Sequence, residues 1–560
     1  MIFSAFFKAY NGASFCFPLF FERPLPILKQ VDGTGVCIIP DREQKRDMTR
    51  VLIIHPPVAK PGEPPAGAAR IRGFLEENHV SCRVLDAGLE GIRFLLQKQP
   101  EIQDTRTANA WRNRDRSLNA LKSGSAFSTV DHYNRIVGSL NRLLFLHGRK
   151  YGYSLDLANC THDFLSPLSS RDLRRCAEKP ENDPFHDYYR DSLISSVRNY
   201  RPDMIGISVN FLSQAFSAFS LTGLLKREFP GCRIVAGGGL ITSWMQKPDW
   251  NNPFSGLVDH CVRGSGEVFF NEILKLNVPG RRVSMPVYND FYRQHYLSPG
   301  FVLPYNTSSG CYWNRCSFCP EPAEGSRYHP LPRERAVREI RQLCRVNRPV
   351  LIHFLDNALA PAFLKTLISN APGVPWYGYV RFTSHFLDPD FCRKLKASGC
   401  AMLKIGLESG DQRVLDHLNK GIDLKMVSKS LFNLHQAGIP LYIYLLFGTP
   451  HESEESAGMT MRFVADHHEC INYINPAVFN MPAAGHEARL YHTRYFSGGD
   501  LSLYVDFHHP LGWDRIRVRH FLDRVLFRHP DIAGIRRMTP KTFTSSHAPF
   551  FHLDIPQSVM

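Results

Sequence analysis

Three cysteines lie within nine residues of the stretch SSGCYWNRCSFCP at 308–320. Cys311, Cys316 and Cys319 are separated by four residues and then by two. Structural zinc usually takes four ligands as two pairs; no second C-x-x-C lies nearby, so His329 would be an improvised fourth ligand. A disulfide with one free thiol is disfavoured in a reducing compartment, and chance clustering is a third alternative. Three thiolates suit a [4Fe–4S] cluster, normally held by four, with one iron open to an outside ligand.

The elements that follow predict where this stretch lies. From residue 301, short apolar runs alternate with stretches of helical periodicity. Six such units predict a complete or partial βα (TIM-like) barrel, in which catalytic groups gather at the carboxyl ends of the strands. The cysteines follow the first strand and so belong to that end. The expected strands are 301–309, 349–357, 375–382, 401–410, 441–450 and 471–480.

The N-terminal half predicts a second parallel sheet, of the doubly wound, Rossmann-like kind, because strands again alternate with helices. Ligands of such sheets bind beyond the carboxyl ends of the strands. The glycine run there would allow a bulky ligand close to the backbone, and a tight turn is the alternative reading of the same run. The strands are expected at 51–57, 81–88, 202–210, 232–240 and 256–267, and the candidate ligand contacts at their ends are Pro56, Asn210, Gly237, Gly238, Gly239, Gly264 and Glu267.

The length and composition limit the class of protein. A chain of 560 residues predicts two to four domains. Its 43% hydrophobic and 21% charged residues are ordinary for a globular protein, and no apolar run reaches the roughly 18 residues of a membrane span. The fourteen cysteines, scattered apart from the three, indicate a reducing, cytoplasmic setting. The net charge of +15 is compatible with an anionic partner, but no nucleic-acid-binding signature stands out, so nucleic acid is not the expected partner.

We expect four segments in the chain. Residues 1–47 are an N-terminal extension of uncertain status, since Met48 stands directly before a clean strand. Residues 48–275 form the Rossmann-like domain, with a polar, mostly helical and solvated insertion at about 89–200. The barrel occupies 295–485. A C-terminal extension, 486–560, is expected either to cap the barrel or to form a basic surface helix.

The second half resembles the radical S-adenosylmethionine (SAM) superfamily, in which three cysteines bind a [4Fe–4S] cluster and SAM chelates the fourth iron. The commonest spacing in that family is three residues and then two, so the four-residue spacer is a departure. The resemblance implies that Tyr312 and Phe318 shield the cluster and flank SAM. It also implies SAM contacts at the strand ends, in LDNA, at an arginine, in GLESG and in FGTP: Asp356, Asn357, Arg381, Glu408, Ser409, Gly448 and Pro450.

The first half resembles the cobalamin-binding domain that precedes the barrel in one subgroup of this superfamily. VLIIHPP, PDMIGISV, IVAGGG and VRGSGE follow in the order of that subgroup. The sequence DAGLEG at 86–91 lacks the histidine of a D-x-H-x-x-G loop. The lower ligand of cobalamin would then be water, another side chain or nothing, and a vestigial domain that binds no cobalamin is the alternative.

The resemblance implies an enzyme that cleaves SAM to a 5′-deoxyadenosyl radical and, with cobalamin, methylates an unactivated carbon. A non-methylating rearrangement or cyclisation is the alternative within the family. A non-catalytic iron–sulfur or cobalamin sensor that binds nucleic acid is the alternative from another class. The expected partners are a small-molecule or peptide substrate and an electron donor such as flavodoxin or ferredoxin, with no membrane.

Overall fold

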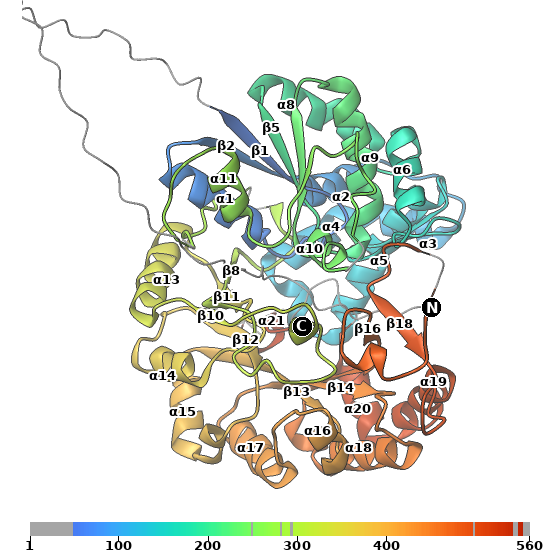
Figure 1. Cartoon of the computed structure of the whole chain (residues 1–560). Helices are drawn as coiled ribbons and strands as arrows, with labels where there is room; N and C mark the ends of the chain where they lie inside the picture. The colour runs from blue at the N-terminus through green and yellow to red at the C-terminus, as the bar shows by residue number, and fades with distance from the viewer. Residues whose placement is uncertain are drawn as a thin grey trace, which may run out of the picture.

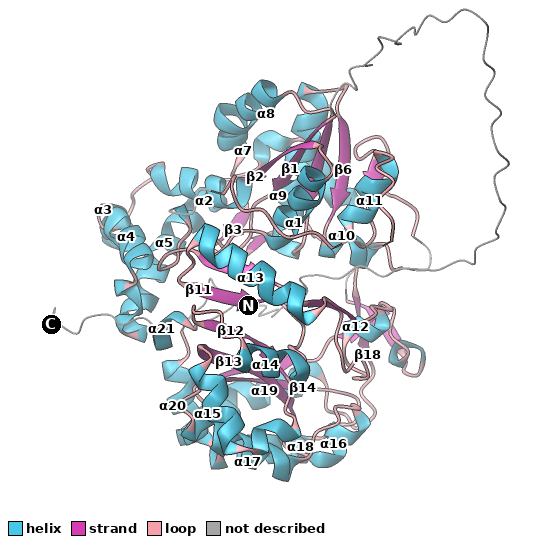
Figure 2. Ribbon diagram, turned by 90° about the vertical axis from the view of Figure 1, so that its left-hand side faces the viewer, coloured by secondary structure: helices cyan, strands magenta, loops and turns pink. Residues whose placement is uncertain are grey.

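The computed structural model describes residues 49–247, 250–280, 283–291, 295–496, 499–540 and 547–552. The expected N-terminal extension, 1–47, lies outside the described residues. Two parallel sheets dominate the chain, one above the other in Figure 1, and helices cover their outer faces (Figures 1 and 2). The predicted α/β class with two parallel sheets is confirmed.

The first sheet has five parallel strands in the order β2-β1-β5-β6-β7. Its strands are β1 (Arg50–His55), β2 (Ser81–Asp86), β5 (Met204–Ser208), β6 (Arg233–Gly237) and β7 (His260–Cys261). Its crossover helices include α1 (Ala66–Glu77), α9 (Leu212–Glu228) and α10 (Gly239–Trp244), and α11 (Gly266–Ile273) follows its last strand. The last strand is shorter than predicted because Leu257 and Val258 donate their backbone N–H groups back to Phe254 and form a turn instead.

The insertion between β2 and β5 is mostly helical, as predicted, but it is not simply solvated. The apolar side of α5 (Val130–Arg149) is buried in the same core as the first sheet, because its apolar residues recur at helical spacing. A short hairpin of β3 (Tyr153–Leu155) and β4 (Cys160–His162) interrupts the helices. The other elements are α2 (Ala87–Gln97), α3 (Thr105–Arg112), α4 (Arg114–Ser123), η1 (Ser125–Ser128), α6 (Ser170–Glu178), η2 (Pro180–Asn182), α7 (His186–Tyr188), η3 (Tyr189–Leu193) and α8 (Ile194–Tyr200).

The second sheet contains all six predicted strands, in the order β15-β14-β13-β12-β11-β8. They are β8 (Val302–Tyr305), β11 (Leu351–Phe354), β12 (Trp376–Val380), β13 (Cys400–Glu408), β14 (Leu441–Phe447) and β15 (Tyr473–Val478). In the described part of the chain β8 and β15 do not pair, so the barrel is partial. The covering helices are α13 (Arg333–Asn347), α14 (Pro361–Ser369), α15 (Pro389–Ala397), α16 (Gln412–His417), α17 (Leu424–Gln436) and α18 (Glu454–Asp466), with η5 (Ser384–Leu387) and η6 (His468–Cys470).

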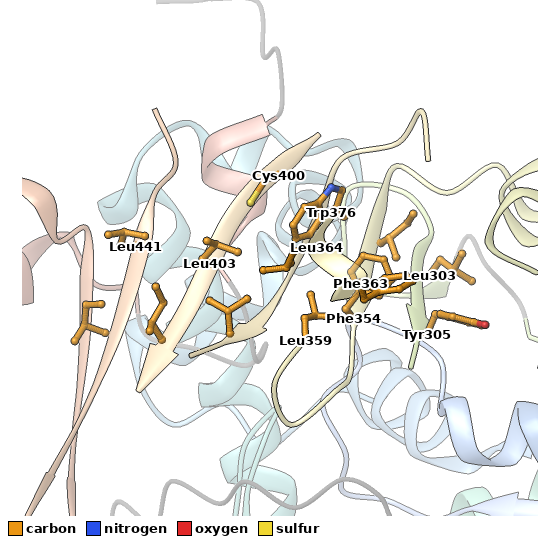
Figure 3. Close-up of a cluster of buried hydrophobic side chains, with 14 of the residues drawn as sticks. Leu303, Tyr305, Phe354, Leu359, Phe363, Leu364, Trp376, Cys400, Leu403 and Leu441 are labelled. Atoms are coloured by element: carbon orange, nitrogen blue, oxygen red, sulfur yellow. The ribbon is translucent and has the colours of Figure 1, made fainter. Parts of the chain in front are cut away.

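The side chains of these strands alternate between two faces, as a pleated strand requires. The outer face is aliphatic and aromatic and packs against the helices; Leu303, Phe354, Trp376 and Leu403 belong to this layer (Figure 3). The inner face carries Tyr377, Met402, Tyr442 and Tyr473 in a separate cluster together with Ala548, from the segment that leads into α21 (Pro549–His552). The strands therefore read as continuous apolar runs because both faces are covered.

The C-terminal extension packs against the barrel. Its antiparallel sheet contains β16 (Met481–Pro482), β17 (Thr493–Tyr495) and β18 (Tyr504–Phe507). It continues through η7 (Glu487–Arg489), α19 (Arg515–Arg524), η8 (Leu526–Arg528) and α20 (Pro530–Met538). The apolar side of α19 is buried, and the ring of Phe521 lies 6.0 Å from that of Phe447. Among the described helices, none combines the length and the apolarity needed to cross a bilayer.

Candidate functional site

The cysteine loop begins where β8 ends, at the carboxyl end of the first barrel strand. On either side of the three cysteines, β9 (Ser308–Ser309) and β10 (His329–Pro330) pair with each other. Helix α12 (Pro320–Ala323) starts directly after Cys319. Gly310 has φ +72°, and a Cβ there would lie 2.4 Å from the Arg327 carbonyl oxygen. Only glycine fits this close approach, which holds the two ends of the loop together.

The three thiols lie close enough to influence one another electrostatically. Burial raises the pKa of the Cys319 thiol to about 12. Burial also raises the pKa of Cys316, while the cations of Lys420 and Arg381 oppose that rise. Within the described residues, no three His, Cys, Asp or Glu side chains converge on a single metal ion.

The segment 418–421 contacts and supports the cysteine loop, and the sequence did not predict this contact. The backbone N–H of Ser317 donates to the Leu418 carbonyl at 3.1 Å. The indole N–H of Trp313 donates to the Asn419 carbonyl at 2.9 Å. Lys420 Nζ lies 2.8 Å from Glu408 Oε1 and 5.7 Å from the centre of the Phe318 ring. This platform fixes the loop that carries the thiols.

Arg381, which directly follows β12, contacts the cysteine loop. Its Nη1 donates to Cys316 Sγ at 3.6 Å, its Nη2 donates to the Lys420 carbonyl, and its guanidinium stacks 4.5 Å from the centre of the Trp313 ring. Tyr312 lies beside the guanidinium, and burial raises its pKa to about 12. Phe318 packs instead against the C-terminal sheet, in a cluster with Phe479 and Val505. The structure thus brings together Arg381, Tyr312 and the thiols.

Asp356 and Asn357 differ in their availability to a ligand. Asp356 is buried, and its two oxygens accept hydrogen bonds from the Thr307 N–H at 2.9 Å, the Thr307 hydroxyl at 2.7 Å and the Ser308 hydroxyl at 2.5 Å. Its carboxylate joins two strand ends. The Nδ2 atom of Asn357 is buried and has no hydrogen-bond partner among the described residues. Of this pair, Asn357 is the side chain that fits the predicted contact with SAM.

Glu408 and Ser409 are also placed differently from one another. Glu408, at φ +67°, is held by Lys420 within the group around Cys316. Ser409 is fully buried; its hydroxyl lies 3.2 Å from that of Thr460 and accepts from the Asp411 N–H at 3.1 Å. Ser409 therefore fixes the turn after β13, whereas Glu408 faces the cysteine loop.

The turn containing Gly448 and Pro450 is braced by the C-terminal extension. The Gly448 N–H and the Trp513 indole N–H both donate to Oε2 of Glu452, the latter at 2.9 Å. His509 Nε2 donates to the Thr449 carbonyl at 2.8 Å. Burial raises the pKa of the Glu452 carboxyl to about 8. The hydroxyl of Thr449 is buried with no partner among the described residues, as the turn of a ligand site would allow.

A cavity of about 1270 Å³, counting space open to solvent, lies at the carboxyl edge of the first sheet. Apolar side chains of β1, β6 and α11 line it, and Asn306, Ser309 and Glu321 line it from the barrel side. It therefore opens between the two sheets, beside the start of the cysteine loop. Six of the candidate contacts line this cavity: Asn210, Gly237, Gly238, Gly239, Gly264 and Glu267.

Two predicted contacts have a structural task. Pro56 does not line the cavity; its carbonyl accepts from Gln214 Nε2 at 2.7 Å. Asn210 Oδ1 accepts from the Gly239 N–H at 3.0 Å and so holds the glycine turn. Gly238, at φ +104°, would place a Cβ 2.5 Å from the Val209 carbonyl oxygen, so this turn requires glycine at that position.

The segment 86–91 has no histidine and forms the N-terminus of α2, and the Asp86 side chain already has hydrogen-bond partners within the protein. Its side chain accepts from the Leu89 N–H at 3.1 Å and from the Tyr296 hydroxyl at 2.7 Å. Burial raises its pKa to about 6. Asp86 caps α2 and binds the linker ahead of the barrel.

The inner face of the barrel carries a polar layer that the sequence did not reveal. His353 Nδ1 lies 2.8 Å from Glu63 Oε1, which comes from the loop between β1 and α1. Lys404 Nζ lies 4.6 Å from the centre of the Tyr379 ring, whose hydroxyl donates to that of Tyr444 at 2.9 Å. Burial lowers the pKa of Lys404 to about 7. These polar groups lie on the same strands as the SAM candidates, nearer the amino ends.

Residues 305–464 match the family model described as the Radical SAM superfamily. This region begins at the end of β8, spans the cysteine loop and ends in α18. The match to this family thus covers the part of the chain that contains the cysteine loop and most of the barrel strands.

Two curated proteins resemble the chain. An uncharacterized methyltransferase of Pyrococcus horikoshii is 22% identical over an alignment of 307 residues, and the match covers 48% of this chain and 65% of that protein. The bacteriochlorophyllide d C-12(1)-methyltransferase of Chlorobaculum tepidum is 27% identical over 172 residues, 29% of this chain and 37% of that protein. The chain thus spans less than two thirds of the length of either relative.

Among solved structures, the radical S-adenosylmethionine methyltransferase TsrM from Kitasatospora setae, with cobalamin and a [4Fe–4S] cluster bound, is similar at a TM-score of 0.48. It is 14% identical, and the match covers 78% of this chain and 76% of that one.

Proposed function

We propose that the chain is a radical SAM enzyme that methylates a carbon atom of its substrate. The observation that carries this proposal is the loop of Cys311, Cys316 and Cys319 at the carboxyl end of a partial βα barrel, inside a region that matches the radical SAM family. Methyl transfer is favoured over a rearrangement because both curated relatives are named methyltransferases. The substrate is a small molecule or a peptide, and flavodoxin or ferredoxin would supply the electron.

The residues present fit the three groups that this function needs. The thiols would hold a [4Fe–4S] cluster, and the partnerless Nδ2 of Asn357 and hydroxyl of Thr449 are buried polar atoms suited to SAM. The large cavity at the first sheet would hold cobalamin against the glycine turn at 237–239. When bound, these groups would supply a 5′-deoxyadenosyl radical and a transferable methyl group.

The side chains of the protein bind, orient and shield these groups. The platform 418–421 holds the cysteine loop, and Lys420 places the Glu408 carboxylate beside it. Glu452 and Trp513 hold the Gly448–Pro450 turn in one position. Phe318 and the C-terminal sheet pack over part of the loop and would limit the access of solvent and its solutes to a reactive intermediate. The inner layer of Tyr379, Lys404 and Tyr444 offers polar contacts to a substrate within the barrel.

One anaerobic experiment tests this function. The reconstituted protein is expected to show iron and sulfide in equal amounts, to cleave SAM to 5′-deoxyadenosine when reduced, and to form S-adenosylhomocysteine once cobalamin and substrate are present. Cys316→Ala should lose the cluster and all SAM cleavage, whereas Cys344→Ala, on α13, should lose neither. A Cys316→Ala protein that keeps both the cluster and SAM cleavage would overturn the proposal. If 5′-deoxyadenosine forms without S-adenosylhomocysteine, the enzyme does not methylate its substrate, and a rearrangement becomes the proposed reaction instead.

A further inference from the structure

Trp313, in the four-residue spacer of the cysteine loop, has two arginines near its ring. The guanidinium of Arg381 lies 4.5 Å from the centre of its ring, and that of Arg315 lies 5.3 Å from it. Arg381 is buried and Arg315 is exposed. The spacer thus contributes a cation–π contact to a buried arginine, which is stronger than the same contact in water.

The ring of Trp313 is fixed in this position by its neighbours. Its indole N–H donates to the Asn419 carbonyl at 2.9 Å, and the next residue, Asn314, donates from Nδ2 to the Ser326 carbonyl at 3.0 Å. Gly421 leaves the space that the ring fills, since a Cβ there would lie 2.1 Å from Trp313 Cζ2. The indole therefore has one orientation and presents its face to Arg381.

The fixed ring determines where the Arg381 guanidinium points. One of its nitrogens donates to the Lys420 carbonyl and the other to Cys316 Sγ at 3.6 Å. Within the described part of the chain, no carboxylate forms an ion pair with Arg381. The cation is consequently directed at a sulfur that the proposed function makes a ligand of the cluster.

We propose that Trp313 is a positioning residue that holds the Arg381 guanidinium against Cys316 Sγ and thereby raises the reduction potential of the cluster. This inference rests on the proposed function, because it requires the cluster. One-electron reduction adds negative charge to the cluster and its thiolates, and hydrogen bonds to the ligand sulfurs and nearby positive charge stabilise the reduced form. The electron comes from the external donor, here a chemical reductant.

The test measures the midpoint potential of the reconstituted cluster without SAM. The full-length wild type, Trp313→Phe, Trp313→Leu and Arg381→Leu are titrated anaerobically with dithionite and followed by electron paramagnetic resonance. Trp313→Leu is expected to shift the midpoint to a lower potential, in the same direction as Arg381→Leu. Trp313→Phe keeps a ring over the guanidinium but loses the bond to Asn419, so a smaller shift is expected. The double variant Trp313→Leu/Arg381→Leu should equal the single Arg381 variant, because the ring acts through the arginine.

Arg315→Gln is the matched control, because it removes the other, exposed arginine near the ring and leaves the Trp313–Arg381 contact. Its midpoint should equal that of the wild type, since solvent and salt screen the exposed charge. A wild-type midpoint in Trp313→Leu with full iron content would overturn the inference. Loss of the cluster from both Trp313 variants would also overturn it, assigning the ring to holding the loop. A wild type that binds no cluster would instead refute the proposed function.

Discussion

Glu452→Gln should change how the stability of the protein depends on pH. Burial raises the carboxyl pKa from 4.5 to about 8. Because the folded-state pKa is above the unfolded one, the folded state binds the proton more tightly. The stabilising effect of that proton is complete below pH 4.5 and is lost as pH rises towards 8. Glutamine is neutral at every pH and keeps an oxygen for the N–H groups of Gly448 and Trp513.

The size of the effect follows from the two pKa values. At about 1.4 kcal/mol per pKa unit, the wild type loses about 2 kcal/mol from pH 4.5 to pH 6 and about 2.4 kcal/mol more by pH 8. The difference in unfolding free energy between variant and wild type should therefore rise by about 2 kcal/mol between pH 6 and pH 8. For a cooperative unit the size of the C-terminal half, this corresponds to roughly 4–8 °C in Tm.

Differential scanning calorimetry of both proteins at pH 6, 7 and 8 measures this difference. Other groups, such as Asp86 and Lys404, titrate equally in both proteins and cancel. Glu455→Gln, an exposed neighbour on α18, is the control and should show a constant difference. A Tm difference for Glu452→Gln that does not change between pH 6 and pH 8 would show that Glu452 is ionised in the folded protein and would refute the reasoning.

Three further substitutions have matched controls. Gly421→Ala should lower the iron content after reconstitution, measured by ferrozine assay, because its Cβ would lie 2.1 Å from the Trp313 ring. Gly438→Ala is the control, because Gly438 has a similar positive φ and its added Cβ would meet no described atom within 4 Å. Equal iron content in the two variants would contradict the prediction. Gly238→Ala should abolish cobalamin binding, measured by absorbance titration, while the cluster content stays normal. Gly256→Ala is the control, because its added Cβ would meet no described atom within 4 Å, and it should bind cobalamin as the wild type does. Lys404→Met should stabilise the protein at pH 7 by up to about 4 kcal/mol in thermal unfolding. The folded-state pKa of Lys404, about 7, lies below the unfolded 10.5, so the wild type loses stability as pH falls between these values. Lys425 is exposed, so Lys425→Met should have little effect, and an equal effect of both variants would exclude a buried cation at Lys404.

The barrel could be predicted because its information is local. The runs at 349–357 and 441–450 are apolar on both faces, and turn residues bound them, so each strand is specified by its own few residues. The cysteine loop was predicted for the same reason. In contrast, the role of the three glycines at 237–239 needed the cavity beside them before it favoured a ligand.

The partners of the site could not be predicted because they are distant in sequence. Glu63 meets His353 across 290 residues, and Trp513 meets Glu452 across 61. Asp356 looked like a ligand contact because it ends a strand, but a buried carboxylate needs hydrogen-bond donors, and Thr307 and Ser308 supply them. Only the packed fold shows which strand-end side chains are already satisfied.

The C-terminal sheet that covers the cysteine loop has a consequence for how the protein is made. Phe318 packs against the cluster that contains Val505, and burial together with the nearby Cys319 thiol raises the pKa of the Tyr504 hydroxyl. Roughly 185 residues separate Cys319 from Tyr504, so at a synthesis rate of about 5–20 residues per second the cover is made roughly 10–40 s after the cysteines. During that interval the loop is synthesised but still lacks its cover. Cluster delivery during translation would meet open thiols, whereas delivery to the finished chain meets a loop in which Cys316 is buried and Cys311 and Cys319 are only partly exposed.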